Sequence, residues 1–460
     1  MRLGEPPIDD GWDDAAPEQS PSATTGQSFE RGDQVELAER LAGELQAESP
    51  TVYADGRFYH YRAAHGIFEI LPPAELSVRV QAYSGSRVAI DTKPLRLKNS
   101  DVNGALTLMG ARLHAEGFFD DAPAGLAFAN GFLLADMIGT SFRPHSAEHR
   151  ARYAYPFPYG WISATPSRFL DFLSQVFRDD EDAQDKAELI REFLGVSLLG
   201  KATKFQQALV FVGGGSNGKG VLSQLMEASA PPGSVCAIAP QNIGHEYRRA
   251  ALAGKLLNIV GELPEADIAD SAAWKDTIAG DTLEGRATYK DCFYFKPRAG
   301  HVYSANNLPG SADHSHGFWR RLLVIKFNRV FTERDKNPNL LEELLLERPQ
   351  IVSWALRGAE NALKRGRYTL PPSVAEAVEA WRRNADQVSL FAEECLTHLD
   401  PKEPLSLGTK GSAIYDAFKS WAINNGHRPL ASNKLPERLK NLGIVGKKSG
   451  TMIYPVRLKW

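Results

Sequence analysis

The sequence predicts an α/β fold built around a parallel β-sheet, and three observations carry this prediction. Between residues 205 and 330, short apolar runs typical of buried strands alternate with segments of helical spacing. One of these runs, Ala208–Val212, is followed directly by a glycine-rich turn and then by a helical segment. With 460 residues, 43% of them hydrophobic, the chain is long enough for roughly two to four domains with cores of their own.

The first 200 residues divide into a tail and a mixed region. Residues 1–32 are acidic and rich in Pro, Ser, Thr and Gly, so they bury too little apolar surface to fold, and we expect a disordered acidic tail. Residues 33–200 are predicted to form an α+β region that leads into a helical collar. Its expected elements are a helix at 33–47, a hairpin or meander at 51–71, a short strand with helix at 75–115, a strand turning at Asn130-Gly131, and helices over 167–200. The charged run Asp179–Asp182 is expected to be solvated.

Three further parts are predicted to follow. Residues 201–335 form the α/β core, and residues 336–400 form a helical extension that is interrupted at Pro371-Pro372. Residues 401–460 hold eleven Lys and Arg against three Asp and Glu, which gives a local charge of +8 in a chain of net charge −3. Their expected order of helix, helix and hairpin is that of a winged helix.

Composition and cysteine spacing exclude several classes of protein. The three cysteines, Cys236, Cys292 and Cys395, are far apart and form no CxxC pair, so neither a zinc ribbon nor a disulfide framework is predicted. The sequence has no apolar run of about 18 residues and no basic-then-apolar leader, so we expect a cytoplasmic protein without a membrane span. Because the net charge is slightly negative, any affinity for nucleic acid must come from local basic patches.

The most specific motif is a phosphate-binding loop directly after the strand Ala208–Val212. Glycines allow backbone N–H groups to turn toward the phosphates of ATP, and the helix that follows presents its positive end to the same anion. Lys219 adds a point charge for the β- and γ-phosphates. Gly220 stands where a Ser or Thr hydroxyl usually coordinates Mg²⁺, so the ion would depend on phosphate oxygens, water and a nearby carboxylate. The residues expected to contact the nucleotide are Gly213, Gly214, Gly215, Ser216, Asn217, Gly218, Lys219, Gly220 and Val221.

Further candidate catalytic residues stand at the ends of two later apolar runs. Glu262 ends LLNIVGE and is a candidate both for activating the attacking water and for the Mg²⁺ site, although a solvated strand-end acid is the alternative. Gly261 precedes it where an Asp is common, and Glu265 is a weaker substitute that would act through water. Asn306 ends HVYSAN, and its amide can hold both the attacking water and the γ-phosphate.

A pair of arginines, Arg320 and Arg321, precedes the last apolar run, LLVIKF. An arginine here can stabilise the charge on the γ-phosphate of a nucleotide bound to a neighbouring subunit. Both arginines are candidates for this role. Without the other motifs, a structural ion-pair role for the pair is the alternative.

The order of these motifs resembles the superfamily 3 DNA helicases, in particular the phage and plasmid primase C-terminal type and the poxvirus primase-helicase-like group. The resemblance covers roughly residues 125–330, and its most specific stretches are Gly213–Lys219, Glu262, WKDTIAGDTLEGR at 274–286, SANNLP at 304–309 and WRRLLVIKF at 319–327. It implies an AAA+-like fold, hexameric rings, and 3′-to-5′ unwinding of DNA in a bacterium or a phage-infected host. It also implies that Lys219 binds phosphate, that Glu262 activates water, and that Asn306 senses the γ-phosphate. For the arginine that acts on the neighbouring subunit, the resemblance implies Arg321 as the first candidate and Arg320 as the second.

DNA contacts are predicted at two places. Residues 284–297 have the pattern of a β-hairpin with a basic tip, and in the resembled family such a hairpin projects into the pore of the ring. An ordinary surface hairpin is the alternative. On the second helix of the winged helix, Asn433, Lys434 and Arg438 would face DNA, although small basic domains also bind proteins. The candidates at and near the hairpin are Lys275, Arg286, Tyr289 and Lys290.

These features together favour an ATP-dependent hexameric helicase that moves 3′ to 5′ on single-stranded DNA during replication of a phage, plasmid or mobile element. The expected cofactors are ATP and Mg²⁺. The expected partners are further copies of the chain, single-stranded and forked DNA, and a separate primase or polymerase. The alternative is an initiator or scaffold protein that binds ATP and DNA and hydrolyses little, and the glycines at 220 and 261 favour it.

Overall fold

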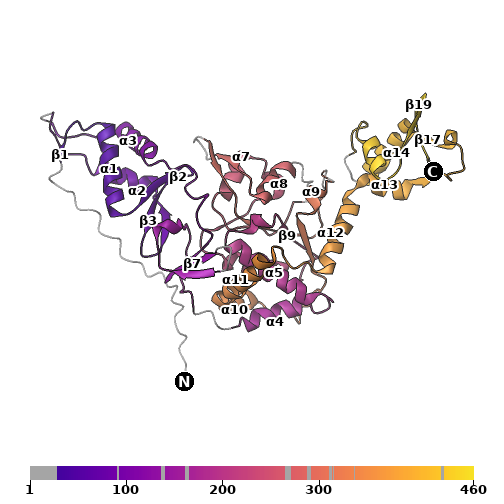
Figure 1. Ribbon diagram of the computed structural model, residues 1–460, viewed down its shortest axis with the longest axis horizontal. Helices are drawn as coiled ribbons and strands as arrows, with labels where there is room; N and C mark the ends of the chain where they lie inside the picture. Colours follow the sequence, from indigo (N-terminus) through magenta and orange to yellow (C-terminus); the bar gives the residue numbers. More distant parts are fainter. Residues whose placement is uncertain are drawn as a thin grey trace, which may run out of the picture. The chain divides into compact units, whose positions relative to one another are not determined.

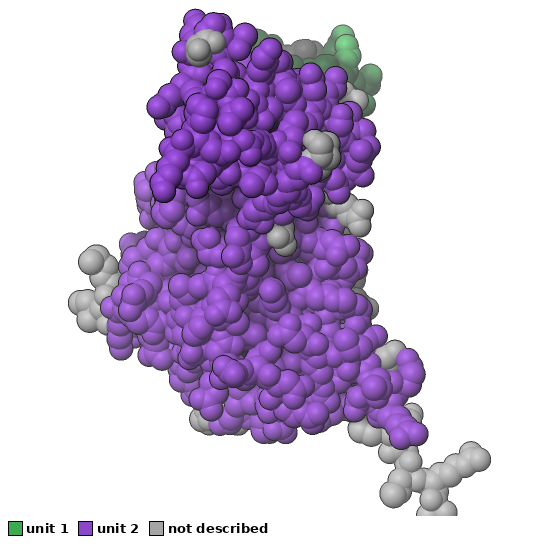
Figure 2. Space-filling model, turned by 90° about the vertical axis from the view of Figure 1, so that its right-hand side faces the viewer, with its two compact units in different colours: residues 1–64, 68–118 green, residues 65–67, 119–460 purple. Residues whose placement is uncertain are grey.

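The computed structural model describes residues 28–90, 93–135, 140–160, 165–264, 271–286, 292–309, 313, 315–335, 337–425 and 429–459. Most of the predicted acidic tail, residues 1–27, therefore lies outside the described residues. The chain forms two compact units, residues 1–64 with 68–118 and residues 65–67 with 119–460, which Figure 2 colours separately. The division at residue 118 falls inside the predicted 33–200 region, and the part after it shares a core with the parallel sheet.

The first unit packs helices against short strands. Asp33 caps α1, because its carboxylate accepts a hydrogen bond from the Glu36 N–H at 2.9 Å. The predicted helix at 33–47 and the predicted meander at 51–71 are both present, and the latter turns at Asp55-Gly56, where both residues have positive φ. The elements are β1 (Ser28–Phe29), α1 (Gln34–Glu48), β2 (Thr51–Ala54), β3 (Arg57–Arg62), β4 (Ile67–Ile70), α2 (Pro73–Gln81), β5 (Arg87–Val88) and α3 (Asn99–Arg112).

The second unit begins with an antiparallel sheet and a pair of helices. The sheet turns at Asn130-Gly131 as predicted, and the helices are separated by the charged run at 179–182. Its strands are β6 (Gly125–Phe128), β7 (Gly131–Ala135) and β8 (Thr140–Arg143), and its helical segments are η1 (Ala147–His149), α4 (Ser167–Val176), α5 (Ala183–Leu198) and η2 (Ala202–Lys204).

A parallel sheet of five strands forms the centre of this unit. Its strand order is β10 (Val235–Cys236), β11 (Leu257–Val260), β14 (Gly300–Ala305), β9 (Ala208–Val212) and β15 (Leu322–Lys326). All four pairings are parallel, so the carboxyl ends of the strands meet at one edge of the sheet. All six residues of β14 are buried, as expected for a strand covered on both faces.

Helices cover both faces of the parallel sheet, so the architecture is three-layered. Alternate side chains of a strand point to opposite faces. Leu209 and Phe211 pack into a core with α4, α5 and the two helices α10 and α11, whereas Ala208 and Val210 pack into a second core with α8, α9 and α12 (Figure 1). The bounds are α6 (Lys219–Ser229), η3 (Pro240–Asn242), α7 (Glu246–Arg249), η4 (Ala250–Leu252), α8 (Ser271–Ala279), α9 (His316–Trp319), α10 (Leu340–Leu345), α11 (Arg348–Arg365) and α12 (Pro372–Ala385).

The charged run before α5 is partly buried, which corrects the expectation that it is solvated. The Lys186 side chain is only 1% exposed, and its amine lies 2.9 Å from the Asp180 carboxylate and 3.6 Å from that of Asp182. Asn328 donates a second hydrogen bond to Asp180 at 2.7 Å, and the Ser373 N–H donates to Asp182 at 2.9 Å. A buried ammonium needs such partners, so half of the run is structural, whereas Asp179 and Glu181 remain exposed.

The C-terminal part has its own apolar core. The predicted order of helix, helix and hairpin is present in α14, α15 and the β18–β19 hairpin. Among the described residues, no helix combines the length and the apolar character that crossing a membrane requires. The elements are α13 (Gln387–Cys395), β16 (Leu396–His398), η5 (Leu405–Leu407), β17 (Thr409–Lys410), α14 (Gly411–Asn424), α15 (Leu435–Asn441), β18 (Lys447–Ser449), β19 (Thr451–Tyr454) and β20 (Val456–Leu458).

Replacing Lys186 by Met should destabilise the second unit by about 3 kcal/mol, because two largely buried carboxylates lose their positive partner. Chemical unfolding followed by tryptophan fluorescence measures the effect. The matched control is Lys364→Met on the exposed end of α11, which should change the free energy of unfolding by less than about 0.5 kcal/mol. Equal midpoints for the two variants would show that the buried cluster has no structural role.

Candidate functional site

The glycine loop, residues Gly213–Gly218, connects the carboxyl end of β9 to the start of α6. Gly218 has a φ of 90°, and a Cβ atom on it would lie 2.9 Å from a methyl group of Val176 on α4. Only glycine fits this position without strain. A Cβ atom on Gly213 would collide with the Asn217 side chain and with the Phe327 carbonyl. The loop is therefore shaped by helix α4 and by the chain that leaves β15.

Lys219, the first residue of α6, is held at the centre of the site. Its side chain is largely buried, with 7% of the residue exposed. The amine donates hydrogen bonds to the Gly213 carbonyl at 2.5 Å, to the Ala305 carbonyl at 2.8 Å and to the Asn306 side-chain oxygen at 3.0 Å. Burial lowers the pKa of this amine, and the negative charge of Glu262 opposes that shift. The lysine thus joins the glycine loop to the end of β14.

Glu262 and Asn306 lie beside this lysine at the same edge of the sheet. Asn306 follows β14, and its amide nitrogen donates a hydrogen bond to the Glu262 carboxylate at 3.2 Å. Glu262 follows β11, the strand that neighbours β14. Both side chains are exposed, so water and ligand can reach them. The three predicted residues Lys219, Glu262 and Asn306 are therefore brought together, although they are 43 and 44 positions apart in the sequence.

The shape and donor set of the site fit a nucleotide and a hard cation. Helix α6 begins within the loop, so the N–H groups of its first turn face the space that the glycines enclose. The Glu262 carboxylate is an oxygen ligand of the type that Mg²⁺ prefers. A Cβ atom built on Gly220 or on Gly261 would meet no described atom within 4 Å. There is thus room at both positions for the hydroxyl and the carboxylate that the sequence lacks.

The two arginines at the end of α9 have opposite environments. Arg321 is 9% exposed, and it donates a hydrogen bond to the Gly317 carbonyl at 2.5 Å. Burial and the charge of Arg320 lower the pKa of Arg321, although acidic side chains nearby oppose the shift. Arg320 is exposed and donates to the Gln206 side chain at 3.0 Å. Of the two candidates, the exposed arginine is the one that a second molecule can reach.

Several of the predicted DNA-binding residues are ion-paired within the chain. The Lys275 amine lies 2.8 Å from the Asp313 carboxylate, and this pairing, with hydrogen bonds from Ser315 and Ser271, outweighs burial and lowers the pKa of Asp313. Arg438 is half-buried and lies 2.5 Å from Asp386, which caps α13. Of the other candidates, Lys434 is exposed and Arg286 is described below. Tyr289 and Lys290 lie outside the described residues.

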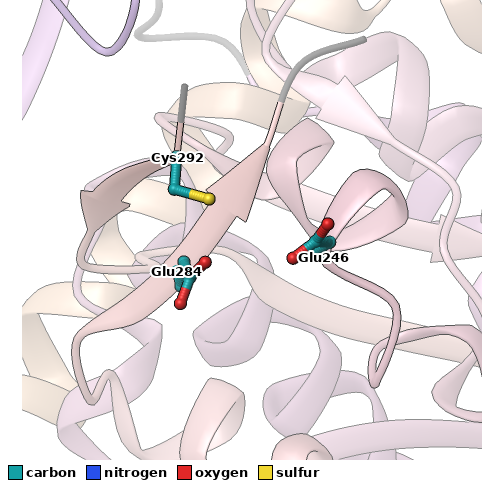
Figure 3. Close-up of side chains that lie close together, drawn as sticks. All are labelled: Glu246, Glu284 and Cys292. Carbon is teal, nitrogen blue, oxygen red and sulfur yellow. The ribbon is translucent and has the colours of Figure 1, made fainter. Parts of the chain in front are cut away.

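The hairpin of β12 (Leu283–Arg286) and β13 (Cys292–Phe295) forms a polar cluster with Glu246 of α7, which Figure 3 shows. The ligand atoms of Glu246, Glu284 and Cys292 lie within 4.8 Å of one another, a spacing that suits a metal ion. The Arg286 guanidinium, however, already lies 3.6 Å from Glu246. A hydrogen bond to Glu284 raises the pKa of the Cys292 thiol, and a metal ligand would need the thiolate. We therefore interpret the cluster as a partner for the Arg286 side chain of the hairpin itself, and not as a metal site.

Two contacts that support the site could not be predicted directly from the sequence. The Ser216 carbonyl in the glycine loop accepts a hydrogen bond from the Phe331 N–H at 2.7 Å, which ties the loop to the chain after β15. Ser223 on α6 and Ser304 on β14 share a hydrogen bond of 3.1 Å, and both are buried. The spacing of Ser223, four residues after Lys219, places it on the same helical face, and that was the only available clue.

Comparison with known proteins gives a family model and several viral relatives. A family of unknown function, DUF5906, matches residues 211–321, a span that contains the loop, Glu262, Asn306 and both arginines. The relatives include "Putative helicase 022R" of Frog virus 3 (isolate Goorha), 25% identical over 62% of this chain, and "Putative helicase L207/L206" of Acanthamoeba polyphaga mimivirus, 28% identical over 52%. "Putative helicase 121R" of Invertebrate iridescent virus 3 is 22% identical over 70% of this chain. The chain spans 27–38% of the length of these three relatives.

Solved structures of the C-terminal region of NrS-1 also match. One apo structure covers 93% of this chain and 100% of the other, with a TM-score of 0.47 and 13% identity. A second apo form covers 76% of this chain and 75% of the other, with a TM-score of 0.45 and 14% identity. The sequence relatives support the assignment of this chain to the class of helicase-like proteins.

Substituting Gly218 by Ala should lower the free energy of unfolding by about 2 kcal/mol, because a side chain at positive φ is strained and its methyl group would press on Val176. Gly215→Ala is the matched control, since a Cβ atom there meets no described atom within 4 Å. Thermal unfolding compares the two variants. If both unfold at the wild-type temperature, the packing of α4 against the loop is not what shapes it.

Proposed function

We propose that this chain is an ATP-dependent helicase of the superfamily 3 type with an AAA+-like core. It assembles into hexameric rings and moves 3′ to 5′ on single-stranded DNA during replication of a phage, plasmid or mobile element. The observation that carries the proposal is the convergence of Lys219, Asn306 and Glu262 at one edge of the parallel sheet. The viral relatives that are named as helicases support it.

Each residue of this site has its own role in ATP hydrolysis. The backbone of residues 213–221 and the Lys219 amine bind the phosphates, because loop N–H groups and a buried ammonium complement their charge. Mg²⁺, when bound, neutralises phosphate charge, and Glu262 is the carboxylate placed to hold it. Glu262 also accepts a proton from the attacking water. Asn306 orients that water, because its amide already contacts both Glu262 and Lys219.

The ring requires a group that acts between subunits, and Arg320 fits this role. Its guanidinium is exposed, whereas that of Arg321 is buried against Gly317. An arginine from a neighbouring subunit stabilises the charge that develops on the γ-phosphate during hydrolysis. Of the two sequence candidates we therefore favour Arg320, the one that had ranked second.

The DNA contacts are assigned to the hairpin and to the basic C-terminal part. Arg286 on β12, together with the sequence candidates Tyr289 and Lys290, would grip the strand within the ring. Lys275 would contribute after it exchanges Asp313 for a phosphate. Residues 401–460 act as a winged helix, in which Lys434 faces DNA. Arg438 is a weaker candidate, because its half-buried pair with Asp386 would have to break first.

A second candidate function is an initiator or scaffold that binds ATP and DNA and hydrolyses little. The specific observation in its favour is that Gly220 and Gly261 leave open space where the usual metal-side ligands would stand. Nucleotide binding by the loop tolerates this loss better than hydrolysis does. The rate of ATP turnover separates the two functions.

The function is tested by measuring phosphate release from ATP with and without single-stranded DNA. We expect DNA to stimulate turnover, and we expect Lys219→Ala and Arg320→Ala each to lower it by at least about 100-fold, since each removes a charge from the transition state. Arg320→Ala should still bind a fluorescent ATP analogue. Lys364→Ala, an exposed substitution on α11, is the control and should match the wild type.

Mixing the two inactive variants tests whether the site is shared between subunits. A mixed ring contains interfaces with an intact Lys219 on one side and an intact Arg320 on the other, so part of the turnover should return. No recovery would overturn the role of Arg320 between subunits. Turnover that is negligible in the wild type and unaffected by DNA would overturn the helicase and favour the scaffold.

Gly220→Thr should lower the Mg²⁺ concentration needed for half-maximal ATP binding several-fold. The side chain fits because a Cβ atom at this position meets no described atom within 4 Å, and its hydroxyl adds the oxygen ligand that is otherwise missing. Gly220→Ala is the control that adds bulk without a ligand. If Thr and Ala behave alike in a Mg²⁺ titration, position 220 does not face the ion.

A further inference from the structure

A second cationic site lies away from the glycine loop, in the same compact unit. It is a cavity of about 70 Å³ whose lining includes the side chains of Arg150, Arg152, Lys296 and Arg298. One carboxylate, that of Asp120, also lines it. A cavity needs about 10–15 Å³ to hold one water molecule, which has one non-hydrogen atom. This cavity therefore has room for roughly five non-hydrogen atoms, the number in a phosphate group.

The cavity lies at the amino edge of the parallel sheet, opposite the glycine loop. Gly254 and Leu256, which also line it, come just before β11. Lys296 and Arg298 stand between the end of β13 and the start of β14. The glycine loop and Asn306 follow the carboxyl ends of their strands. The two sites are therefore separated by the length of the strands, and the cavity belongs to neither the loop nor the arginine pair.

The guanidinium groups in the cavity are held in place by the surrounding chain. Arg298 donates hydrogen bonds from one nitrogen to the carbonyls of Asp120 and Ala122. The Arg152 guanidinium lies 3.7 Å from the centre of the Phe119 ring, a favourable cation–π contact. A Cβ atom on Gly254 would collide with the Arg152 side chain. Both groups are thus preorganised, which reduces the entropy cost of binding a ligand.

The cavity has more cationic than anionic lining residues. It has four cationic side chains against one lining carboxylate, and that carboxylate already accepts a hydrogen bond from the Lys296 N–H at 3.3 Å. Burial and the charge of Arg152 lower the pKa of Arg298, despite the opposing charges of Asp120 and Asp121. A guanidinium does not lose its proton in a protein, so these positive charges persist, and an anion bound in the cavity would complement them.

We propose that this cavity binds a backbone phosphate of a single DNA strand. The exposed residue Lys296, which directly follows β13, lines the cavity. Strand β13 pairs with β12, the strand that carries Arg286. A strand gripped at the hairpin would therefore reach the cavity with its next phosphates. Arginine forks bind phosphate oxygens well, and a phosphate contact carries no sequence preference. The identity of the polymer rests on the proposed function, whereas the preference for a phosphate rests on the cavity.

The test is the binding of a fluorescein-labelled oligothymidylate to the full chain, measured by anisotropy without ATP over a salt series. In the double variant Arg150→Gln/Lys296→Gln we expect affinity to fall about five- to tenfold at ~0.1 M salt, and the slope of log affinity against log salt to fall by about 0.7, the value for one lost phosphate. The matched control is Lys364→Gln/Arg367→Gln, which removes two exposed charges at the end of α11. The single variant Lys296→Glu, at an exposed position, should show the same loss without a change in unfolding temperature.

The outcomes separate this proposal from its alternatives. Equal affinity and equal salt slope for the wild type, the double variant and the control would overturn it. Unchanged oligonucleotide binding with loss of inorganic phosphate binding, measured at matched ionic strength, would assign the cavity to free phosphate compounds and also overturn it. Because no ATP is present, a loss of oligonucleotide binding supports the cavity even if the chain proves unable to hydrolyse ATP. Failure of the motor and failure of the cavity are thus distinguishable.

Discussion

The rest of the site depends on one constraint, the need of the buried Lys219 ammonium for oxygen partners. An ammonium withdrawn from water is costly unless hydrogen bonds replace its hydration. The loop carbonyl of Gly213, the strand-end carbonyl of Ala305 and the Asn306 side chain supply them. This arrangement is possible only because β9 and β14 are neighbours in the parallel sheet. The strand order, the loop and the lysine therefore support one another.

Local features of the site could be predicted from the sequence, whereas the choice between neighbouring residues could not. The strand at 208–212, the loop and α6 follow from apolar runs and glycines that are adjacent in the chain. Which of two consecutive arginines is buried depends on how α9 packs. Arg321 was the preferred candidate from the sequence, and the structure shows that this side chain is buried. The partner of Arg438 is Asp386, 52 residues away, and no local pattern reports such a contact. Asp182 and Lys186 are four residues apart, a spacing that permits an ion pair on a helix, yet the run Asp179–Asp182 was expected to be solvated, because the burial of Lys186 depends on how α5 packs.

Ion pairing within the chain would determine how readily each cation of the proposed DNA contacts can bind a phosphate. The side chains of Arg286 and Glu246 are 43% and 34% exposed, and pairs of that kind contribute little to stability, so a phosphate can displace the carboxylate. The side chains of Arg438 and Asp386 are 19% and 16% exposed, and separating them would leave a partly buried charge without a partner. The hairpin is therefore better suited to a grip that forms and releases than is the buried side of α15.

Strand β14 holds the two proposed anion sites at a fixed separation. It is six residues long, so it spans about 20 Å, and every one of its residues is buried. Asn306 follows its carboxyl end beside the proposed nucleotide site, and Arg298 precedes its amino end in the cationic cavity. A buried central strand cannot shorten or slip in register without exposing its apolar side chains. A shift of the sheet edge at the proposed nucleotide site would therefore move the cavity residues with it as one body. The proposed motor would require this property if it gripped DNA at the opposite edge.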